Sequence, residues 1–437
     1  MNIREFMGKL EAEGKLIRIR REVSVYHEAA EVMATLDGKP VYFEKIRESS
    51  IPIVGNLLSS RQLVAMALNV DVKGILHKLN WAMNNLKEPP IVDEGACQEV
   101  VEGNVDLTKL PILKHMPGDR GRYVTSAVCI LRDPQTEVRN SSFHRLLLLD
   151  ERRFVARIVE GRGTDTILKR SGGEAEVAIC IGSPIQVMIA AATSLPHGVD
   201  ELGMANALEP TPLVKCKKID LEVPAETEIV LEGRITREKA PEGPFLDITE
   251  TYDMEREQPI IEVKCITHRR NPIYQALIPG KSEHKILMGM PMEPLIYNEV
   301  NKVCKCINVY ITPGGASWLH AIIQIKKERE DDAKKAIEAT FKAHKSLKHC
   351  IVVDEDINIY DLEEVEWAIA TRVQADEDVY IYRGERGSSL DPSAKYIPGE
   401  KPITAKMGID ATIPLGKKDK PFKREKYKQV KIEEYLS

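Results

Sequence analysis

Residues 227–252 read TEIVLEGRITREKAPEGPFLDITETY, an apolar strand-like run that ends in a Gly-Pro turn with Glu242 before it and Asp247 after it. In a helix, five residues correspond to about 500°, which places the two carboxylates on different faces, and Pro244 would break that helix. In a strand, the odd spacing directs them to opposite sides. The two carboxylates can therefore converge only where the chain folds back, either in an ordinary acidic turn or in a built carboxylate pair.

The segment around this stretch, from Tyr123 to His268, is rich in short strand-like runs separated by turn signals. The runs are SAVCILRD, SSFHRLLLLD, RRFVARIV, EVAICIGS, LVKCKKIDLEV, TEIVLEGRI and PIIEVKCITHR. Two helical stretches, IQVMIAAATS and DELGMANALE, interrupt them. Short strands of this kind favour a barrel or a sandwich.

Both flanks of the β-rich segment alternate helix and strand signals, so we expect a mixed α/β, multidomain protein. The first hundred residues contain a helix near 3–13, strands at KPVYFEKI and IPIVGNL, and helices between residues 60 and 86. After residue 279 a helix, PLIYNEVNKVC, precedes a second α/β unit. The predicted division is an N-terminal α/β domain (1–110), a β-rich domain (111–285), a linker helix (286–305) and a C-terminal α/β domain with a loop-rich tail (306–437).

Composition excludes several classes of protein. The formal net charge of the 437 residues is −5 with scattered basic residues, so no nucleic-acid partner is expected. No run of eighteen apolar residues occurs, and we expect a cytoplasmic protein without stable membrane insertion. Of the eight cysteines, Cys304 and Cys306 form a C-x-C motif without a second pair, which does not predict a zinc site.

Arg145 and Asn140 lie in NSSFHRLLLL, where the polar residues border an apolar strand. A buried arginine needs an anionic partner, because an unpaired buried charge is costly. The turn that carries Glu242 and Asp247 is one source of such a partner, and a surface salt bridge is the alternative.

Two further stretches contain groups that suit phosphate or metal binding. In RIVEGRGTDTI, Gly161 and Gly163 flank Arg162, an arrangement that suits a phosphate but also fits a plain glycine turn. In SLPHGVDELGMANAL, Glu201 follows Asp200, which is a helix N-cap candidate. Oxygen ligands such as Glu201 and Asn140 are those that hold Mn²⁺ or Mg²⁺.

In combination these motifs resemble a known family. The ordered set N-x4-R, R-[IV]-x3-RG, D-E-x4-NAL, LEVPAETEIVLEG and APEGPFLD is similar to the UbiD family of reversible decarboxylases, which use prenylated flavin mononucleotide. IVVDEDINIYDLEEVEWAIATR and AKMGIDAT extend the resemblance, which spans Met1 to Thr412. It implies an N-terminal α/β domain, a central split β-barrel that binds the flavin, a C-terminal α/β domain, and a homodimer or higher homo-oligomer.

The resemblance also implies roles for individual residues. Arg145, Glu242 and Asp247 match the catalytic set, with Asp247 as proton donor. The residues that match flavin-contacting positions are Phe143, His144, Arg145, Arg157, Ile158, Val159, Arg162, Gly163 and Lys406. Asn140 and Glu201 match ligands of the divalent metal, for which Mn²⁺ is expected and Mg²⁺ and K⁺ are further candidates. Some members have a third, histidine ligand near Arg162, where this chain reads Glu160-Gly161-Arg162. A flavin prenyltransferase is the implied source of the cofactor.

The substrate implied by the resemblance is a small carboxylic acid. The sequence is closest in appearance to the archaeal branch that decarboxylates trans-anhydromevalonate 5-phosphate to isopentenyl phosphate in the modified mevalonate pathway of isoprenoid synthesis. Arg120 and Arg122 in KHMPGDRGRYVT are candidates for binding the substrate phosphate, and loop salt bridges are the alternative. The first alternative function is decarboxylation of an aromatic acid of the 4-hydroxybenzoate or polyprenyl-4-hydroxybenzoate type. The second is a flavin-binding protein without turnover.

Overall fold

The computed structural model describes residues 1–396, 402–417, 422, 424–425, 427–428, 430–431 and 434–436. The chain divides into two compact units: Met1–Leu295 with Ile311–Trp318, and Ile296–Tyr310 with Leu319–Ser437. We call these the first and second units and describe each by itself. Part of the predicted C-terminal tail lies outside the described residues.

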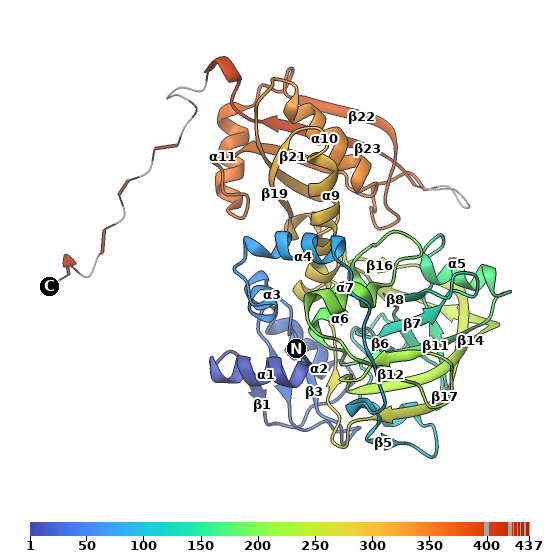
Figure 1. The fold of residues 1–437 in the computed structure, drawn as a ribbon. Coiled ribbons are helices and arrows are strands. Elements are labelled where there is room, and N and C mark those ends of the chain that lie inside the picture. The colour runs from blue at the N-terminus through green and yellow to red at the C-terminus, as the bar shows by residue number, and fades with distance from the viewer. Residues whose placement is uncertain are drawn as a thin grey trace. The chain divides into compact units, whose positions relative to one another are not determined.

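A nine-stranded sheet forms the centre of the first unit, in the order β6-β9-β10-β17-β14-β11-β7-β8, with β5 pairing with β17 (Figure 1). Its strands are β5 (Val100–Val101), β6 (Tyr123–Val124), β7 (Val128–Arg132), β8 (Arg139–Phe143), β9 (Leu146–Leu148), β10 (Arg153–Ala156), β11 (Ala175–Ile181), β14 (Ile229–Glu242) and β17 (Arg256–His268). Because β6 and β8 end the order without pairing with each other, the sheet is an open barrel. The predicted fold class, a mixed α/β chain around a split barrel, is confirmed.

The two longest strands, β14 and β17, pair antiparallel from Ile229 opposite His268 to Glu242 opposite Arg256. The register shifts twice along this pair, after Glu232 and after Ile235. Such irregularities bend and twist a strand, which long strands need in order to follow a barrel wall. Glu242 is the last residue of β14 that pairs with β17, so its position is fixed by the wall of the barrel.

The N-terminal part of the first unit has its own sheet, β1-β2-β3-β18. Its strands and helices are β1 (Ile17–Ile19), β2 (Val41–Phe43), β3 (Ile53–Gly55), β18 (Tyr274–Gln275), α1 (Ile3–Ala12), α2 (Glu28–Thr35), α3 (Arg61–Leu68) and α4 (Gly74–Asn84). β18 follows the barrel in the chain and returns to pair with β3. Two buried cores of this unit each mix residues from before and after position 110.

One predicted barrel strand is wrong. LVKCKKIDLEV forms two short strands, β12 (Leu213–Lys215) and β13 (Glu222–Pro224), which build a separate sheet with β4 (Ile91–Val92). The chain bends between them because the backbone N–H groups of Lys217 and Lys218 both donate to the buried carboxylate of Glu232, at 2.8 and 2.6 Å. These two hydrogen bonds hold the segment between β12 and β13 in a bend, so that it does not continue as a barrel strand.

The remaining elements of the first unit are the hairpin β15 (Phe245–Leu246) and β16 (Tyr252–Asp253) and a set of helices. The helices are α5 (Gly163–Arg170), α6 (Ile185–Ala192), α7 (Glu201–Leu208), α8 (Ser282–Gly289) and α9 (Glu293–Val300), the last of which continues into the second unit. α6 and α7 match the two predicted helical interruptions. α5 was not predicted, because the GRGTDT stretch indicates only a turn.

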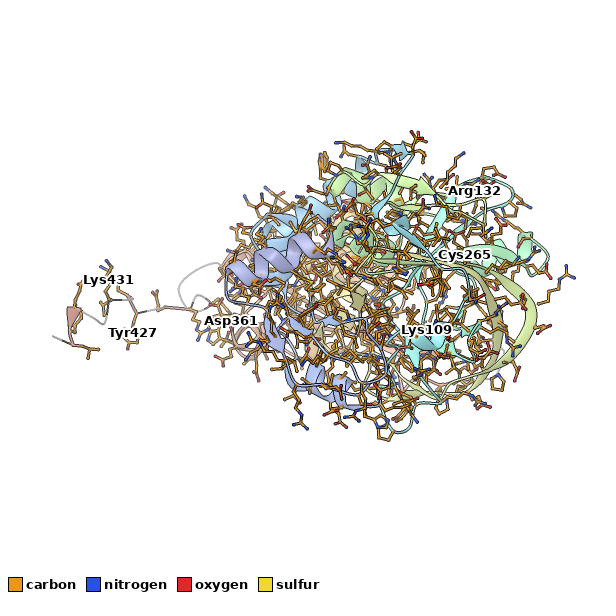
Figure 2. The ribbon with its side chains drawn as sticks, turned by 90° about the horizontal axis from the view of Figure 1, so that it is seen from below. Lys109, Arg132, Cys265, Asp361, Tyr427 and Lys431 are labelled. Carbon is orange, nitrogen blue, oxygen red and sulfur yellow. The ribbon has the colours of Figure 1, made fainter. Side chains whose placement is uncertain are left out.

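The described part of the second unit contains a five-stranded sheet, in the order β19-β20-β21-β23-β22, and two helices besides the end of α9. Its elements are β19 (Lys305–Ile311), β20 (His320–Lys326), α10 (Asp332–Ala343), β21 (His349–Asp354), α11 (Leu362–Arg372), β22 (Val379–Arg386) and β23 (Ile403–Ala411). β20, β21 and β23 run parallel. Asp361, labelled in Figure 2, caps α11 by accepting from the N–H groups of Glu363 and Glu364.

All eight cysteines are free thiols, and all except Cys216 are buried. Cys265 lies on β17 among the packed side chains of the barrel (Figure 2). Among the described residues, no helix is long and apolar enough to cross a membrane. The finer division of residues 1–285 into two domains stays a prediction.

Candidate functional site

Arg145 is the centre of a buried ion cluster. It lies between β8 and β9, with its side chain 11% exposed. Its Nε and Nη2 donate to the two carboxylate oxygens of Glu242 at 2.8 and 2.9 Å, and its Nη1 donates to Oδ2 of Asp247 at 3.2 Å. The glutamate side chain is fully buried. The carboxylates on either side of the Gly-Pro turn therefore converge on one guanidinium, which makes them a built pair rather than an ordinary acidic turn.

The hairpin β15–β16 places Asp247. Glu242 ends β14, and the chain reverses through Gly243, whose φ of +89° lies in the left-handed region that favours glycine. Asp247 then occupies the tight turn of the hairpin, where its N–H donates to the carbonyl of Thr251 at 3.0 Å and its carbonyl accepts from Glu250 at 2.9 Å. The fold-back that the sequence required is this hairpin.

Asp253 is a third carboxylate of the cluster, and it was not predicted from the sequence. It stands opposite Phe245 in the hairpin register. Its Oδ2 accepts from Nη2 of Arg145 at 2.9 Å and pairs with Nη1 of Arg256 at 2.7 Å. Only the register of β15 with β16 brings it here, and the symmetrical spacing of acids in FLDITETYD was the one available signal.

Arg157 completes the cluster. Its Nε lies 3.9 Å from Oδ2 of Asp253, and its Nη1 donates to the carbonyl of Ile158 at 2.7 Å. Burial and the neighbouring positive charge of Arg256 lower the pKa of Arg157. The guanidinium of Arg157 is half-buried and its ion pair is longer than those of Arg145 and Arg256, so it is suited to bind a further anion.

The segment 115–123 supports the Gly-Pro turn from outside. The N–H of Arg120 donates to the carbonyl of Pro244 at 3.1 Å, and the hydroxyl of Tyr123 accepts from the N–H of Gly243 at 3.2 Å. The ring of Phe245 lies 4.3 Å from that of Tyr123, centroid to centroid, and its centroid lies 5.0 Å from the guanidinium carbon of Arg145. The turn is therefore held by backbone and aromatic contacts.

His115 is also packed edge-on against Phe245, with 5.9 Å between the ring centroids. Burial lowers the pKa of His115 to about 3. The imidazole is therefore neutral at physiological pH and adds no positive charge beside the ion cluster.

A second polar cluster lies at the N-terminus of α5. His144 Nδ1 lies 2.9 Å from the carbonyl of Arg157, so this nitrogen carries the proton, and Nε2 accepts from the hydroxyl of Thr164 at 2.9 Å. Ser142 Oγ lies 3.1 Å from the same Nε2. No side chain among the described residues caps the start of α5. Hydroxyl groups beside uncapped helix N–H groups form the kind of site that binds a phosphate.

Asn140 lies directly over Gly163, the first residue of α5. A Cβ at position 163 would fall 1.7 Å from Oδ1 of Asn140, so only glycine permits this approach. The predicted glycine turn is thus a close contact between β8 and α5, and it sets the position of the amide oxygen.

Glu201 opens α7 and faces the open edge of β8. Its Oε2 accepts from the N–H of Ser141 at 2.8 Å, next to Asn140 in the chain. Burial raises the pKa of Glu201 to about 8, and no lysine or arginine of the described residues pairs with it. A buried carboxylate without a cationic partner fits a metal ligand. Within the described part of the chain, however, no group of three His, Cys, Asp or Glu side chains has metal-site geometry.

Of the other predicted flavin-contacting residues, all except Lys406 lie at the end of β8 or between β10 and α5. Phe143 is half-buried at the end of β8 and Ile158 is buried, whereas Val159 and Arg162 are exposed on the loop before α5. Lys406 lies on β23 of the second unit. There it is buried, its Nζ donates to the carbonyl of Lys345 at 2.7 Å, and burial lowers its pKa. Its assignment to the cofactor stays a prediction.

The two candidate phosphate-binding arginines have different surroundings. Arg120 forms an ion pair with Glu255, and its Nη1 also lies 3.4 Å from the carbonyl of Gly243, next to Glu242. Arg122 has its guanidinium carbon 5.9 Å from the ring centroid of Tyr26. Arg120 is thus beside the Gly-Pro turn and Arg122 is on the aromatic ring. Their role in binding a phosphate stays a prediction.

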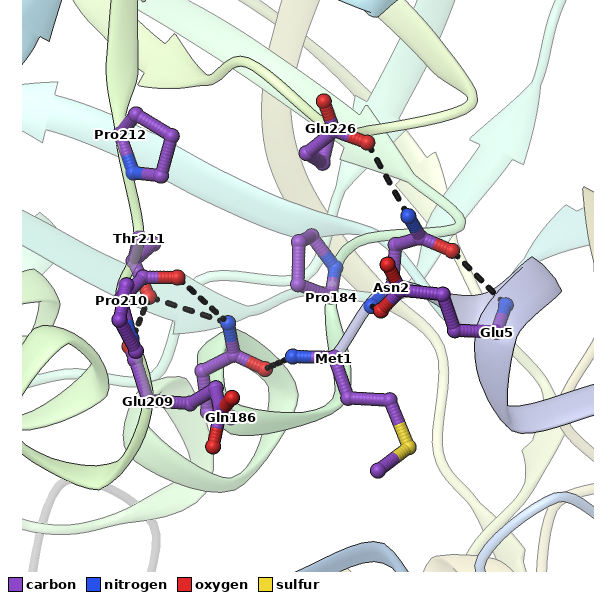
Figure 3. Close-up of a pocket in the computed structure, with 10 residues that line it drawn as sticks. All are labelled: Met1, Asn2, Glu5, Pro184, Gln186, Glu209, Pro210, Thr211, Pro212 and Glu226. Atoms are coloured by element: carbon purple, nitrogen blue, oxygen red, sulfur yellow. Dashed lines mark hydrogen bonds between the residues drawn. The ribbon is translucent and has the colours of Figure 1, made fainter. Parts of the chain in front are cut away.

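A separate pocket of about 170 Å³ lies where the N-terminus meets α6 and the end of α7 (Figure 3). The Met1 amine donates to Oε1 of Gln186 at 3.0 Å, and Nδ2 of Asn2 donates to Oε2 of Glu226 at 3.1 Å. None of the predicted site residues lines this pocket. This pocket is therefore separate from the ion cluster around Arg145.

Comparison with known proteins shows similarity along the whole chain. The family model described as 3-octaprenyl-4-hydroxybenzoate carboxy-lyase Rift-related domain matches residues 90–282. The models for the N-terminal and C-terminal domains of the same carboxy-lyase match residues 7–83 and 285–411.

Among individual proteins, the chain is 42% identical to the anhydromevalonate phosphate decarboxylase of Methanothermobacter thermautotrophicus, over 96% of this chain and 98% of that one. It is similar to the solved structure of the UbiD-class enzyme HmfF from Pelotomaculum thermopropionicum in complex with FMN, with a TM-score of 0.95, 40% identity and full coverage of both chains. An evolved dimeric form of HmfF in complex with prFMN gives a TM-score of 0.91 at 38% identity, again with full coverage of both chains.

Proposed function

Because the chain belongs to the UbiD family of carboxy-lyases, we propose that it is a prenylated-FMN-dependent, non-oxidative decarboxylase whose substrate is trans-anhydromevalonate 5-phosphate and whose products are isopentenyl phosphate and CO₂. The observation that carries the reaction type is the convergence of Glu242 and Asp247 on Arg145. The observation that carries the substrate is the 42% identity over nearly the full length of an archaeal enzyme of that name.

The residues present fit the proposed cofactor. The uncapped N-terminus of α5, with Thr164 and His144, would hold the flavin phosphate. Asn140 and Glu201 would hold a divalent cation beside it, which we propose to be Mn²⁺, with Mg²⁺ or K⁺ as further candidates. Prenylated FMN, when bound, supplies the electron sink for the bond that breaks. The cofactor would come from a flavin prenyltransferase.

The chain's own residues orient the acid and move the proton. Arg145 is the cation that would bind the substrate carboxylate, and the buried Glu242 fixes its orientation through two parallel hydrogen bonds. When the C–C bond to the carboxylate breaks, CO₂ leaves and the electron pair stays with the organic part, which needs one proton. Asp247 is the partly exposed acid that can deliver this proton, and it is replenished from solvent.

Two alternatives remain as outcomes of experiment. An aromatic acid of the 4-hydroxybenzoate type would use the same groups without the need for a phosphate site. A flavin-binding protein without turnover would have no need for three carboxylates around one guanidinium, so the ion cluster argues against it. We further propose that the protein acts as a homodimer or higher homo-oligomer.

The test of the proton donor is Asp247→Asn in enzyme reconstituted with prenylated FMN and Mn²⁺. We expect CO₂ release to fall by about 10²-fold or more, because general acid catalysis contributes this much, while flavin stays bound. Asp133→Asn is the matched control, since Asp133 is a buried aspartate paired with Arg170 in the β7–β8 turn. Near-normal turnover by Asp247→Asn would remove Asp247 as donor.

A further inference from the structure

The guanidinium of Arg145 has almost no hydrogen-bonding capacity left. Of its five N–H groups, two donate to Glu242, one to Asp247 and one to Asp253. A carboxylate ligand binds a guanidinium best through two parallel N–H bonds. The substrate carboxylate can therefore bind Arg145 in this way only if one of the three protein carboxylates gives up its place.

The three carboxylates differ in how firmly they are held. Glu242 is fully buried, ends a barrel strand and makes both of its bonds to Arg145, so its release would leave a buried charge unpaired. Arg145 is the one ion-pair partner of Asp247 among the described residues. Asp253 has a second partner in Arg256 at 2.7 Å and a third in Arg157 at 3.9 Å. Asp253 therefore loses least on leaving Arg145.

We propose that Asp253 is a displaceable counter-ion: the substrate carboxylate replaces it at Nη2 of Arg145, while Asp253 remains paired with Arg256. Its departure leaves one N–H on each Nη of Arg145, which is the fork that a carboxylate needs. The exchange forms and breaks hydrogen bonds only. This inference rests on the proposed function, because it requires an acid as ligand.

The exchange makes Asp253 a positioning and selectivity residue. Asp253 competes with the substrate carboxylate for Nη2 of Arg145. A ligand must carry a full negative charge to displace Asp253 from this position. A neutral group such as an amide cannot replace the lost ion pair. A carboxylate, which must displace Asp253, therefore binds less tightly than it would without this competitor, whereas an amide leaves Asp253 in place and its affinity is little affected. Arg256 sets the strength of the competition, because it determines how readily Asp253 lets go of Arg145.

The experiment uses the enzyme reconstituted with prenylated FMN and two probes. The first is the saturated analogue of the proposed substrate, 3-methyl-5-phosphooxypentanoate, and the second is its primary amide. Their dissociation constants are read from flavin fluorescence, and KM for the unsaturated acid is measured alongside. Asp253→Asn keeps the side-chain shape but removes the competing charge.

For Asp253→Asn we expect the dissociation constant of the acid probe and KM to fall roughly 3- to 10-fold, as loss of one competing charged hydrogen bond implies, with little change for the amide. Arg256→Gln is expected to raise both acid values by a similar factor, because Asp253 then holds Arg145 more firmly. The double variant should return to the Asp253→Asn values. Arg153→Gln is the matched control, since Arg153 pairs with Asp150 at the same i,i+3 spacing as Arg256 with Asp253.

An unchanged or higher dissociation constant for the acid in Asp253→Asn, or equal effects on acid and amide, would overturn the proposal. If Asp253→Asn does not fold, Arg256→Gln decides alone. A larger rise in the dissociation constant of the acid than in that of the amide, each relative to wild type, supports the exchange, and equal rises overturn it. The binding probes need no turnover. If the wild-type enzyme releases no CO₂ from the unsaturated acid, the proposed function is contradicted, while the effects of the variants on binding of the acid probe still test the exchange.

Discussion

Arg145 keeps its positive charge in a place where burial alone would disfavour it. Burial lowers the pKa of Arg145, but the hydrogen bonds and charge of Glu242, with the charges of Asp247 and Asp253, more than offset this and raise it. Three carboxylates and three guanidinium groups, those of Arg145, Arg157 and Arg256, balance one another in the cluster. Because the charge of Arg145 is already balanced by carboxylates of the protein, we propose that an acid binds to it by replacing one of them.

A prediction at this scale concerns Arg120 and Arg122. Replacing either with alanine is expected to raise KM for the phosphorylated acid roughly tenfold, the cost of a hydrogen bond between charged groups, while KM for an unphosphorylated analogue changes little. Arg237→Ala, an exposed arginine paired with Glu174, serves as control. Steady-state kinetics with both acids measure the effect. Equal changes for the two acids would mean that the arginines act only through their contacts with Glu255 and Tyr26.

At the level of residues, the sequence predicted the members of the ion cluster that lie next to sequence signals. Glu242 and Asp247 flank a Gly-Pro turn, and Arg145 is out of place beside an apolar strand. Asp253 and Arg256 were missed, because the spacing of acids in FLDITETYD is a weak signal for Asp253 and Arg256 has no local signal. Their positions depend on the register of β15 with β16 and of β14 with β17, and pairing register is a long-range property.

At the scale of elements, α5 brings the proposed phosphate site against β8 through Gly163. For Gly163→Ala we expect a loss of affinity for flavin and metal of about tenfold or more, because the new methyl group displaces the amide of Asn140. Gly8→Ala is the control, since Gly8 lies in α1 with open space around it. Flavin absorbance and metal content after gel filtration measure the loss. Full retention of both by Gly163→Ala would remove Asn140 from the site.

Helix α8 carries a second element-scale prediction. Burial raises the pKa of Glu283 to about 7, against a reference of 4.5, although the N–H of Leu58 donates to it at 2.8 Å. Because the folded state binds this proton more tightly than the unfolded chain, its stabilising effect is full below pH 4.5 and is lost as the pH rises through about 7. The loss amounts to about 3 kcal/mol.

The comparison of wild type with Glu283→Gln isolates this effect, since the amide cannot ionise. Relative to the variant, the Tm of the wild type should fall between pH 5 and pH 8. Thermal unfolding across this range measures the difference. A difference in Tm that stays constant with pH would show that Glu283 does not take up a proton on folding.

Most elements could be predicted from periodicity, and the exceptions have physical causes. α5 begins with glycine and two threonines, whose local preferences favour a turn over a helix. LVKCKKIDLEV looks like one strand, but the carboxylate of Glu232, fifteen residues after Lys217, bends it into two. The first error comes from local preferences that the fold overrides, and the second comes from a contact with a residue outside the local sequence.

At the scale of the whole molecule, the order of textures along the chain, α/β then β-rich then α/β, predicted the architecture. It did not predict that β18 returns to the N-terminal sheet or that β4 pairs with β12. These pairings join the predicted first and second domains into one compact unit. The spacing of residues does not predict these long-range strand pairings, because they depend on which edge of a sheet is left open.

CO₂ release by enzyme reconstituted with prenylated FMN and Mn²⁺ decides both the reaction and the substrate, when trans-anhydromevalonate 5-phosphate and 4-hydroxybenzoate are compared side by side. We predict turnover of the phosphorylated acid alone, with stoichiometric isopentenyl phosphate. Turnover of 4-hydroxybenzoate alone would keep the decarboxylase and contradict the substrate. Absence of CO₂ release from both acids, with flavin bound, would contradict the proposed function.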